Sequence, residues 1–227
     1  MNWPAILLSI RLASTVCVLL LLIGGPMAYW IAFSPRRWKF LVEAVVALPL
    51  VLPPTVLGYY MLVALSPQST LGRLAESIFS ARLAFSFPGL VIASVIYSLP
   101  FAVQPMANAF AGVDRNLLNA AAVLGASGWR RFQTITLPLA KAGVITGAVL
   151  SFAHTIGEFG VVLMVGGNIP GATQTISIAI YDEVQALDYA TAARTSALLL
   201  IFSFIALAFV YAVNRRTTIW WSSARNA

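Results

Sequence analysis

The sequence predicts an all-α protein that crosses a membrane several times. Apolar residues make up 60% of the 227 residues and charged residues only 9%, and the mean hydropathy is +0.88, a composition far outside the range of soluble domains. A helix needs about 20 mostly apolar residues to cross about 30 Å of hydrocarbon, where it satisfies its own backbone hydrogen bonds. The chain therefore has room for about five to six transmembrane helices, and we treat residues 1–227 as a single membrane domain.

Five apolar runs are long enough to cross the membrane. They cover residues 12–33, 42–65, 90–110, 142–165 and 196–213. The stretch 173–181 is a weaker, sixth candidate. A crossing there would put the tail that carries Arg215 and Arg216 outside the cell, so we expect 173–181 to be interfacial or re-entrant.

The basic residues are placed as topology signals. The formal charge is +7, but Lys and Arg lie scattered between apolar runs, which argues for membrane lipid and against nucleic acid as a partner. Lys and Arg favour the cytoplasmic side of short loops. Five crossings place the basic residues of 36–39, 115–141 and 215–216 on that one side. The N-terminus is then outside and the C-terminus in the cytoplasm.

Prolines interrupt the second apolar run. Pro49, Pro53 and Pro54 remove backbone donors and block ordinary helical bonding at membrane depth. Broken helices occur there where protein or a water-filled cavity surrounds the freed carbonyls, so Pro53 and Pro54 are candidates for the lining of a transport pathway. A simple kink packed against neighbouring helices is the alternative. Pro100 and Pro105 weaken the third run in the same way, which favours a moving gate.

The fourth apolar run carries a polar face. Ser151, His154, Thr155 and Glu158 are spaced by three and four residues, which places them on one side of a helix. A carboxylate at mid-membrane costs about 2.5 to 3.5 kcal/mol on insertion scales, so Glu158 should face the protein interior, with His154 as its expected partner. These residues either line a pathway or gate, or join helices by hydrogen bonds. No second acidic residue lies in the interior of a span, which argues against a proton-driven carrier.

The chain carries no chemical machinery of its own. It lacks a Gly-rich phosphate loop, a Cys/His metal set and a Ser/His/Asp arrangement, and it has a single His and a single Cys. We therefore expect no catalytic residue, metal or cofactor in this chain, and a membrane-embedded enzyme is disfavoured. If transport is uphill, the energy must come from a separate subunit. A secondary carrier or channel that works without a motor is the distant alternative.

A polar segment at about 112–140 separates the third and fourth runs and has a basic excess. Residues 116–124 are rich in Ala and Leu and should form a short helix. Gly125 should end this helix, and Ser127 should cap the helix that follows. Pro138 suits the first turn of the following spanning helix. The segment is thus predicted to be a short surface helix tied rigidly to two spans, a lever suited to transmitting a push.

This segment resembles the cytoplasmic loop of ABC importer permeases. That loop has the pattern E-A-A, three residues, Gly, nine residues, then I-x-L-P, and the chain matches it at Ala120, Ala121, Gly125, Ile135, Leu137 and Pro138. Asn119 stands where the pattern has Glu. Three further stretches resemble the permease subunits of molybdate ABC transporters: LPLVLPPTVLGYY at 48–60, GEFG at 157–160 and GNIPGATQTISIAIY at 167–181. His154 stands where this resemblance leads us to expect Arg, and Gln104 and Pro105 replace an expected basic residue.

The resemblance implies a type I ABC importer permease fold in a prokaryotic plasma membrane. It implies a homodimer with two ATP-binding subunits, which hold ATP and Mg²⁺, docked beneath at residues 119–138. It also implies an extracytoplasmic receptor that delivers molybdate or tungstate, and inward-facing and outward-facing states. A permease of a sulfate, thiosulfate or dedicated tungstate importer is the near alternative. The pathway or gate candidates are Pro53, Pro54, Ser151, His154, Thr155 and Glu158.

Overall fold

The computed structural model describes residues 2–79 and 82–225, and side chains from 215 onward, including Arg215 and Arg216, lie outside the described part. Every described element is a helix, which confirms the all-α prediction. Among the described residues, four helical stretches are long and apolar enough to cross a membrane: Trp3–Phe33, Phe87–Ala111, Gly128–Gly157 and Tyr189–Asn214. The bent pair α2 and α3 makes a fifth if it counts as one span. The structure thus supports the lower of the two predicted helix numbers.

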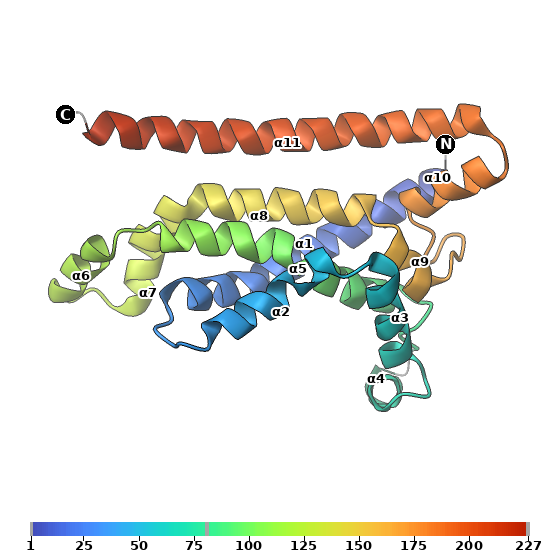
Figure 1. The fold of residues 1–227 in the computed structure, drawn as a ribbon, viewed down its shortest axis with the longest axis horizontal. Coiled ribbons are helices and arrows are strands. Elements are labelled where there is room, and N and C mark those ends of the chain that lie inside the picture. Colours follow the sequence, from blue (N-terminus) through green and yellow to red (C-terminus); the bar gives the residue numbers. More distant parts are fainter. Residues whose placement is uncertain (1, 80–81, 226–227) are drawn as a thin grey trace.

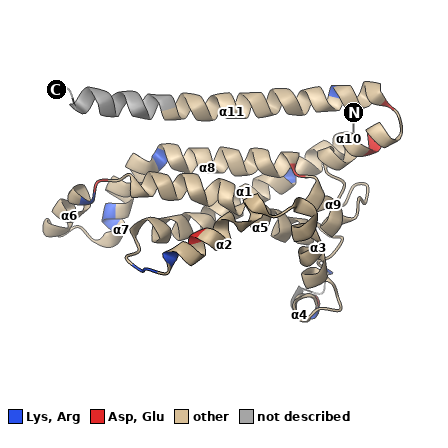
Figure 2. Ribbon diagram, in the orientation of Figure 1, with Lys and Arg blue, Asp and Glu red and all other residues tan. Residues whose placement is uncertain are grey.

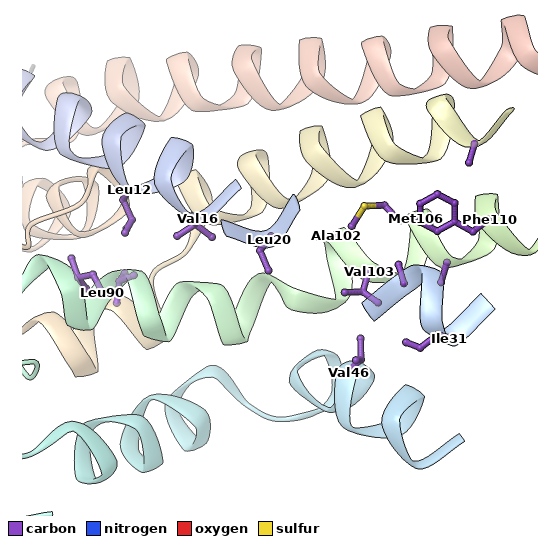
Figure 3. Packing of buried hydrophobic residues seen from close by; sticks show 14 of the residues in the cluster. Leu12, Val16, Leu20, Ile31, Val46, Leu90, Ala102, Val103, Met106 and Phe110 are labelled. Atoms are coloured by element: carbon purple, nitrogen blue, oxygen red, sulfur yellow. The ribbon is translucent and has the colours of Figure 1, made fainter. Parts of the chain in front are cut away.

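Three long helices form the centre of the molecule: α1 (Trp3–Phe33), α5 (Phe87–Ala111) and α8 (Leu137–Gly157). They run side by side along the long axis (Figure 1). The buried residues of their shared core are mostly aliphatic, and Figure 3 shows Leu12, Val16, Leu20, Leu90, Val103, Met106 and Phe110. These helices hold the remaining elements in place.

Two glycines let α8 approach α5 closely. A Cβ at Gly143 would lie 2.7 Å from the Pro105 carbonyl oxygen, and a Cβ at Gly147 would lie 2.7 Å from the Ala102 carbonyl oxygen. Such distances are too short for any side chain, so the backbones touch only because both positions lack one. Small residues spaced by four are a common means of close helix packing in membranes.

The second apolar run is broken where its prolines predict. Helix α2 (Lys39–Val51) ends before Leu52, which is extended, and the axis of α3 (Pro54–Leu65) is bent by 111° from that of α2. Pro49 is accommodated within α2. After α3 come the short α4 (Thr70–Phe79) and then α5. The break confirms that this run is not a straight anchor helix.

The prediction of one spanning helix over 142–165 is wrong at both ends. The helical stretch starts at Gly128 with α7 (Gly128–Arg131), passes through a π-helical turn, η1 (Phe132–Thr136), and continues as α8. Pro138 does lie in the first turn of α8, but η1 precedes it without a break. At the other end Glu158 and Phe159 leave the helical conformation, and α9 (Gly160–Gly166) is a separate helix.

The last two helices lie on the outside of the bundle. Helix α10 (Ile176–Gln185) has ten residues, a length of about 15 Å that is too short to cross a membrane. Helix α11 (Tyr189–Arg225) runs alongside α8 with most of its apolar surface exposed (Figure 1). An apolar helix covered so little by its own chain needs lipid or another subunit around it.

Charged residues gather towards the two ends of the molecule. Figure 2 shows Lys and Arg at the end that carries the start of α2 and the helices α6 (Arg115–Val123) and α7, while acidic residues of α10 lie at the opposite end. The bundle between them is almost free of charge, as a hydrocarbon layer requires.

Candidate functional site

The polar segment between α5 and α8 forms a capped helix followed by a tight turn. Asp114 caps α6 by accepting a hydrogen bond of 2.8 Å from the Asn116 backbone N–H. Gly125 has a φ of +81°, the left-handed conformation that favours glycine after a helix. Ser127 then caps α7 by accepting from the Arg130 N–H at 3.2 Å. The predicted helix, its glycine stop and the second cap are all confirmed.

The tip of this segment presents apolar side chains to the outside. Val123 is 88% exposed, Leu124 86% and Trp129 66%, and neither α6 nor α7 contains a buried residue. Exposed apolar groups on a rigid turn are typical of a protein-binding surface. The sequence motif did not include these three residues, although their position around Gly125 was a usable signal. We call residues 115–131 the coupling segment.

The motif residues themselves are divided between the surface and the bundle. Asn119 and Ala120 are exposed on α6 and Ala121 is half-buried. Ile135 packs against the main core, while Leu137 and Pro138 are exposed at the start of α8. The motif therefore spans the surface helix and its attachment to the core.

Phe132 attaches the coupling segment to the bundle. Its ring stacks on Trp129 at a centroid distance of 5.5 Å and lies edge-on to Tyr29 of α1 at 5.4 Å. Phe110 of α5 is the third neighbour, at 6.4 Å. The Phe132 ring thus links the coupling segment to α1 and α5 at the point where the helical stretch continues into α8.

A cavity of about 520 Å³ lies where the broken second run meets the break after α8. Pro54 and Thr55 of α3 form one side, Tyr97 of α5 and His154 of α8 form another, and Glu158 lies at the end of α8. Pro54 and Thr55 are exposed, so the cavity opens at the surface of this chain. Sequence reasoning had singled out Pro54, His154 and Glu158 but had missed Thr55 and Tyr97. Pro53 is exposed at the helix break and does not line the cavity.

His154 is held firmly on its side of the cavity. Its Nδ1 lies 2.9 Å from Ser98 Oγ on α5. The ring stacks on Phe101 at a centroid distance of 3.9 Å and contacts Tyr97 at 4.9 Å. These contacts fix the ring orientation with respect to α5.

Glu158 is 4% exposed, and neither of its carboxyl oxygens has a hydrogen-bond partner in the described part of the chain. The expected pairing with His154 is wrong. Residues four apart meet only while the helix continues, and Glu158 has an extended conformation (φ −65°, ψ 134°) just beyond the last helical residue, Gly157. His154 contacts Ser98 instead.

Ser151 and Thr155 are fully buried and do not line the cavity. Ser151 donates to the Ala148 carbonyl at 3.1 Å, and Thr155 donates to the Ser151 carbonyl at 2.8 Å. Thr155 also lies 2.9 Å from Ser98 Oγ. In this conformation their contacts favour the structural interpretation, hydrogen bonds within and between helices.

A polar cluster joins the far end of the bundle. The Asp182 carboxylate on α10 accepts from Asn168 at 3.0 and 3.1 Å and from Gln174 at 2.8 Å. Asn2 donates to Gln174 at 2.9 Å and so ties the start of α1 to this cluster. Asn168 has a φ of +57°. Sequence reasoning gave these residues no role.

No group of three or more His, Cys, Asp or Glu side chains is arranged to hold a metal ion among the described residues. The cavity instead offers hydroxyls, an imidazole and a carboxyl group. Such a lining suits weak polar contacts with a passing solute.

Comparison with known proteins identifies the family. A family model described as "Binding-protein-dependent transport system inner membrane component" matches residues 21–219. The chain belongs to this family of transport permeases. The permease is accordingly a multi-pass protein of the inner membrane, and it is the transport component rather than an enzyme.

Relatives of the permease include two named for molybdenum transport. The molybdenum transport system permease protein ModB of Azotobacter vinelandii is 50% identical over 211 residues, which cover 93% of each chain. ModB of Escherichia coli (strain K12) is 41% identical over 184 residues, 81% of this chain and 80% of that one. A probable sulfate transport system permease protein, cysT of Chlorokybus atmophyticus, is 31% identical over 201 residues, 86% of this chain and 70% of that one.

Solved ABC importers share the fold of the permease. A bacterial alginate ABC transporter in complex with an alginate pentasaccharide-bound periplasmic protein matches with a TM-score of 0.75 at 18% identity, over 95% of this chain and 78% of that one. The inward-facing MetNI methionine ABC transporter matches with a TM-score of 0.67 at 15% identity, over 96% of this chain and 95% of that one. The ABC importer permease fold predicted from the sequence is thereby confirmed.

Proposed function

We propose that the permease moves molybdate into the cytoplasm, driven by ATP hydrolysis in a partner subunit. The observation that carries this proposal is the 50% identity to a molybdenum transport permease over 93% of both chains. The coupling segment supports it, because a rigid apolar tip attached to three core helices is what an external motor needs. The chain supplies the path, and ATP and Mg²⁺ are bound by the partner.

The coupling segment faces the cytoplasm in this proposal. It shares its end of the molecule with the basic residues at the start of α2, in keeping with the preference of Lys and Arg for that side (Figure 2). The N-terminus and α10 lie at the opposite end, and α11 returns towards the coupling end (Figure 1). The N-terminus is then outside, the C-terminus inside, and α4 and α10 face an extracytoplasmic molybdate-binding protein.

The working assembly is a homodimer with two ATP-binding subunits. Exposed apolar residues on α2 and α3, among them Val45, Val51 and Tyr60, offer a surface for a second copy. The cavity opens on α3, next to this surface. One ATP-binding subunit docks on each coupling segment, with Val123, Leu124 and Trp129 as the apolar contacts.

Sulfate or thiosulfate import is the second candidate, favoured by the relative named for sulfate transport at 31% identity. Tungstate has the same shape and charge as molybdate and remains a second cargo of the proposed transporter. A carrier or channel that works without a motor has less support, because the family is named for binding-protein-dependent transport.

Uptake into proteoliposomes tests this proposal. The permease is reconstituted with its ATP-binding subunit and receptor, and uptake of radiolabelled molybdate is followed with excess unlabelled tungstate or sulfate. We expect ATP-dependent uptake that tungstate suppresses and sulfate does not. Strong suppression by sulfate would favour sulfate or thiosulfate import. Equal uptake without ATP would contradict transport driven by ATP hydrolysis.

A further inference from the structure

A chain of hydrogen bonds beside the cavity has a fixed direction. Thr155 Oγ1 lies 2.8 Å from the Ser151 carbonyl, which can only accept, so the Thr155 hydroxyl donates there. Its single hydrogen is then used, and Ser98 must donate in the 2.9 Å contact between Ser98 Oγ and Thr155 Oγ1. The Ser98 hydrogen is used in turn. In the 2.9 Å contact with Ser98 the donor is therefore His154 Nδ1–H.

This direction leaves His154 Nε2 as an acceptor. A neutral imidazole carries one hydrogen, and Nδ1 holds it. Phe101 and Tyr97 pack on the ring, and no hydrogen bond engages Nε2 in the described part of the chain. His154 lines the cavity, so the free edge with Nε2 is the part that a solute meets.

The cavity contains no fixed positive charge, since neither Lys nor Arg lines it. The other titratable groups in the lining are Tyr97 from α5 and Glu158 after α8, and α3 and α9 contribute none. Arg11 of α1 is placed over the Phe87 ring at 4.4 Å, and Arg194 of α11 is exposed. The cavity therefore gains a positive charge when His154 takes up a proton.

Glu158 adds a hydrogen-bond donor. Burying an ionised carboxylate without a partner is so costly that the group keeps its proton instead. The protonated carboxyl then donates to an oxygen of the solute, and the Tyr97 and Thr55 hydroxyls are further donors in the lining.

Resting on the proposed function, we propose that this cavity binds the oxyanion together with one proton, shared between His154 Nε2 and an anion oxygen. The proton comes from the outer water and leaves with the anion on the inner side, so the bound unit carries one negative charge instead of two. Hydrogen sulfate releases its proton far more readily than hydrogen molybdate or hydrogen tungstate. The cavity therefore favours molybdate and tungstate over sulfate.

The test measures molybdate transported per ATP hydrolysed by the reconstituted complex, at about pH 6 and about pH 8 on both sides of the membrane. For wild type we expect this ratio to rise several-fold at the lower pH. His154→Gln cannot accept the proton, so its ratio should be the same at both pH values and about tenfold below that of wild type at the lower pH. His154→Arg supplies a fixed charge, so its ratio should depend less on pH than that of wild type.

Ser98→Ala tests the positioning of the imidazole. Without the Ser98 oxygen the ring hydrogen is free to move to Nε2, and the pH dependence should weaken although His154 is still present. Thr195→Ala, which removes another buried hydroxyl bonded to a helical carbonyl, is the matched control and should retain the wild-type pH dependence. The amount of assembled complex is measured for each variant.

A wild-type ratio and pH dependence in either His154→Gln or Ser98→Ala would overturn the inference. So would a pH dependence in His154→Arg equal to that of wild type. If the wild-type complex takes up no oxyanion, the proposed function itself fails, and that result is distinct from uptake that is merely indifferent to these substitutions.

Discussion

The ring of Phe132 lies edge-on to the ring of Tyr29, with centroids 5.4 Å apart. Phe132 is the first residue of η1, and Tyr29 is near the end of α1. The contact joins the residue that follows the coupling segment to a helix that is more than one hundred residues earlier in the sequence. It gives a physical route by which motion at α6 and α7 reaches the bundle.

Replacing Phe132 with Ala should weaken that route. The substitution removes the contacts with Tyr29, Phe110 and Trp129, at a cost of about 2 kcal/mol because the ring is only half-buried. We expect the variant to assemble with the ATP-binding subunit and hydrolyse ATP while it transports less molybdate per ATP. Phe132→Leu keeps apolar volume and should reduce the molybdate transported per ATP less than Phe132→Ala does. Equal losses of assembly and transport would show that the contact is merely structural.

Gly125→Val should uncouple transport without expelling the protein from the membrane. A Cβ at Gly125 meets no atom within 4 Å, so the penalty arises from the φ of +81°, which a β-branched residue adopts only at a cost of about 1 to 2 kcal/mol. ATP hydrolysis and uptake are measured on the same vesicles. Gly125→Asn is the control, because Asn tolerates this conformation. Normal uptake by Gly125→Val would count against the lever.

Leu124→Asp should weaken docking of the ATP-binding subunit. The side chain is 86% exposed at the tip of the segment, and a buried charge at an interface hot spot costs about 2 kcal/mol or more, or about thirtyfold in affinity. Affinity is measured with the purified subunits in detergent. Gln133→Ala, an exposed change on η1, should leave it unchanged. If both variants bind as wild type, Leu124 does not contribute to the docking surface.

Gly147→Leu should destabilise the bundle itself. The new Cβ would lie 2.7 Å from the Ala102 carbonyl oxygen and 3.2 Å from Met106, and overpacking of this kind costs about 1 to 3 kcal/mol. Thermal unfolding in detergent should show a lower midpoint. Gly25→Ala on α1, where a Cβ meets nothing within 4 Å, serves as the comparison. Unchanged midpoints for both would mean that α5 and α8 pack less closely than described.

Local chemistry made much of the fold predictable. The break at Pro53 and the stop at Gly125 each follow from one residue's backbone preferences, and the apolar runs mark the long helices. The end of α8 was missed because the apolar run continues through Gly157 and Glu158 into α9, so hydropathy has no signal there. The wrong pairing of His154 with Glu158 followed from that continuous helix.

Contacts between distant residues could not be predicted. The partner of His154 is Ser98, on another helix, and Asn2 meets Gln174 across 172 positions. The helix packing sets these pairs, and a single sequence does not reveal it. The position of Val123 and Leu124 beside Gly125 was a usable signal, but their exposure depends on how the rest of the chain packs around the turn.

Uptake of radiolabelled molybdate by vesicles that contain the permease and receptor, with and without the ATP-binding subunit and ATP, tests the central claim most directly. We predict accumulation above the outside concentration only when the subunit and hydrolysable ATP are both present, and its loss in Leu124→Asp. Accumulation of the same extent without the ATP-binding subunit would contradict the account.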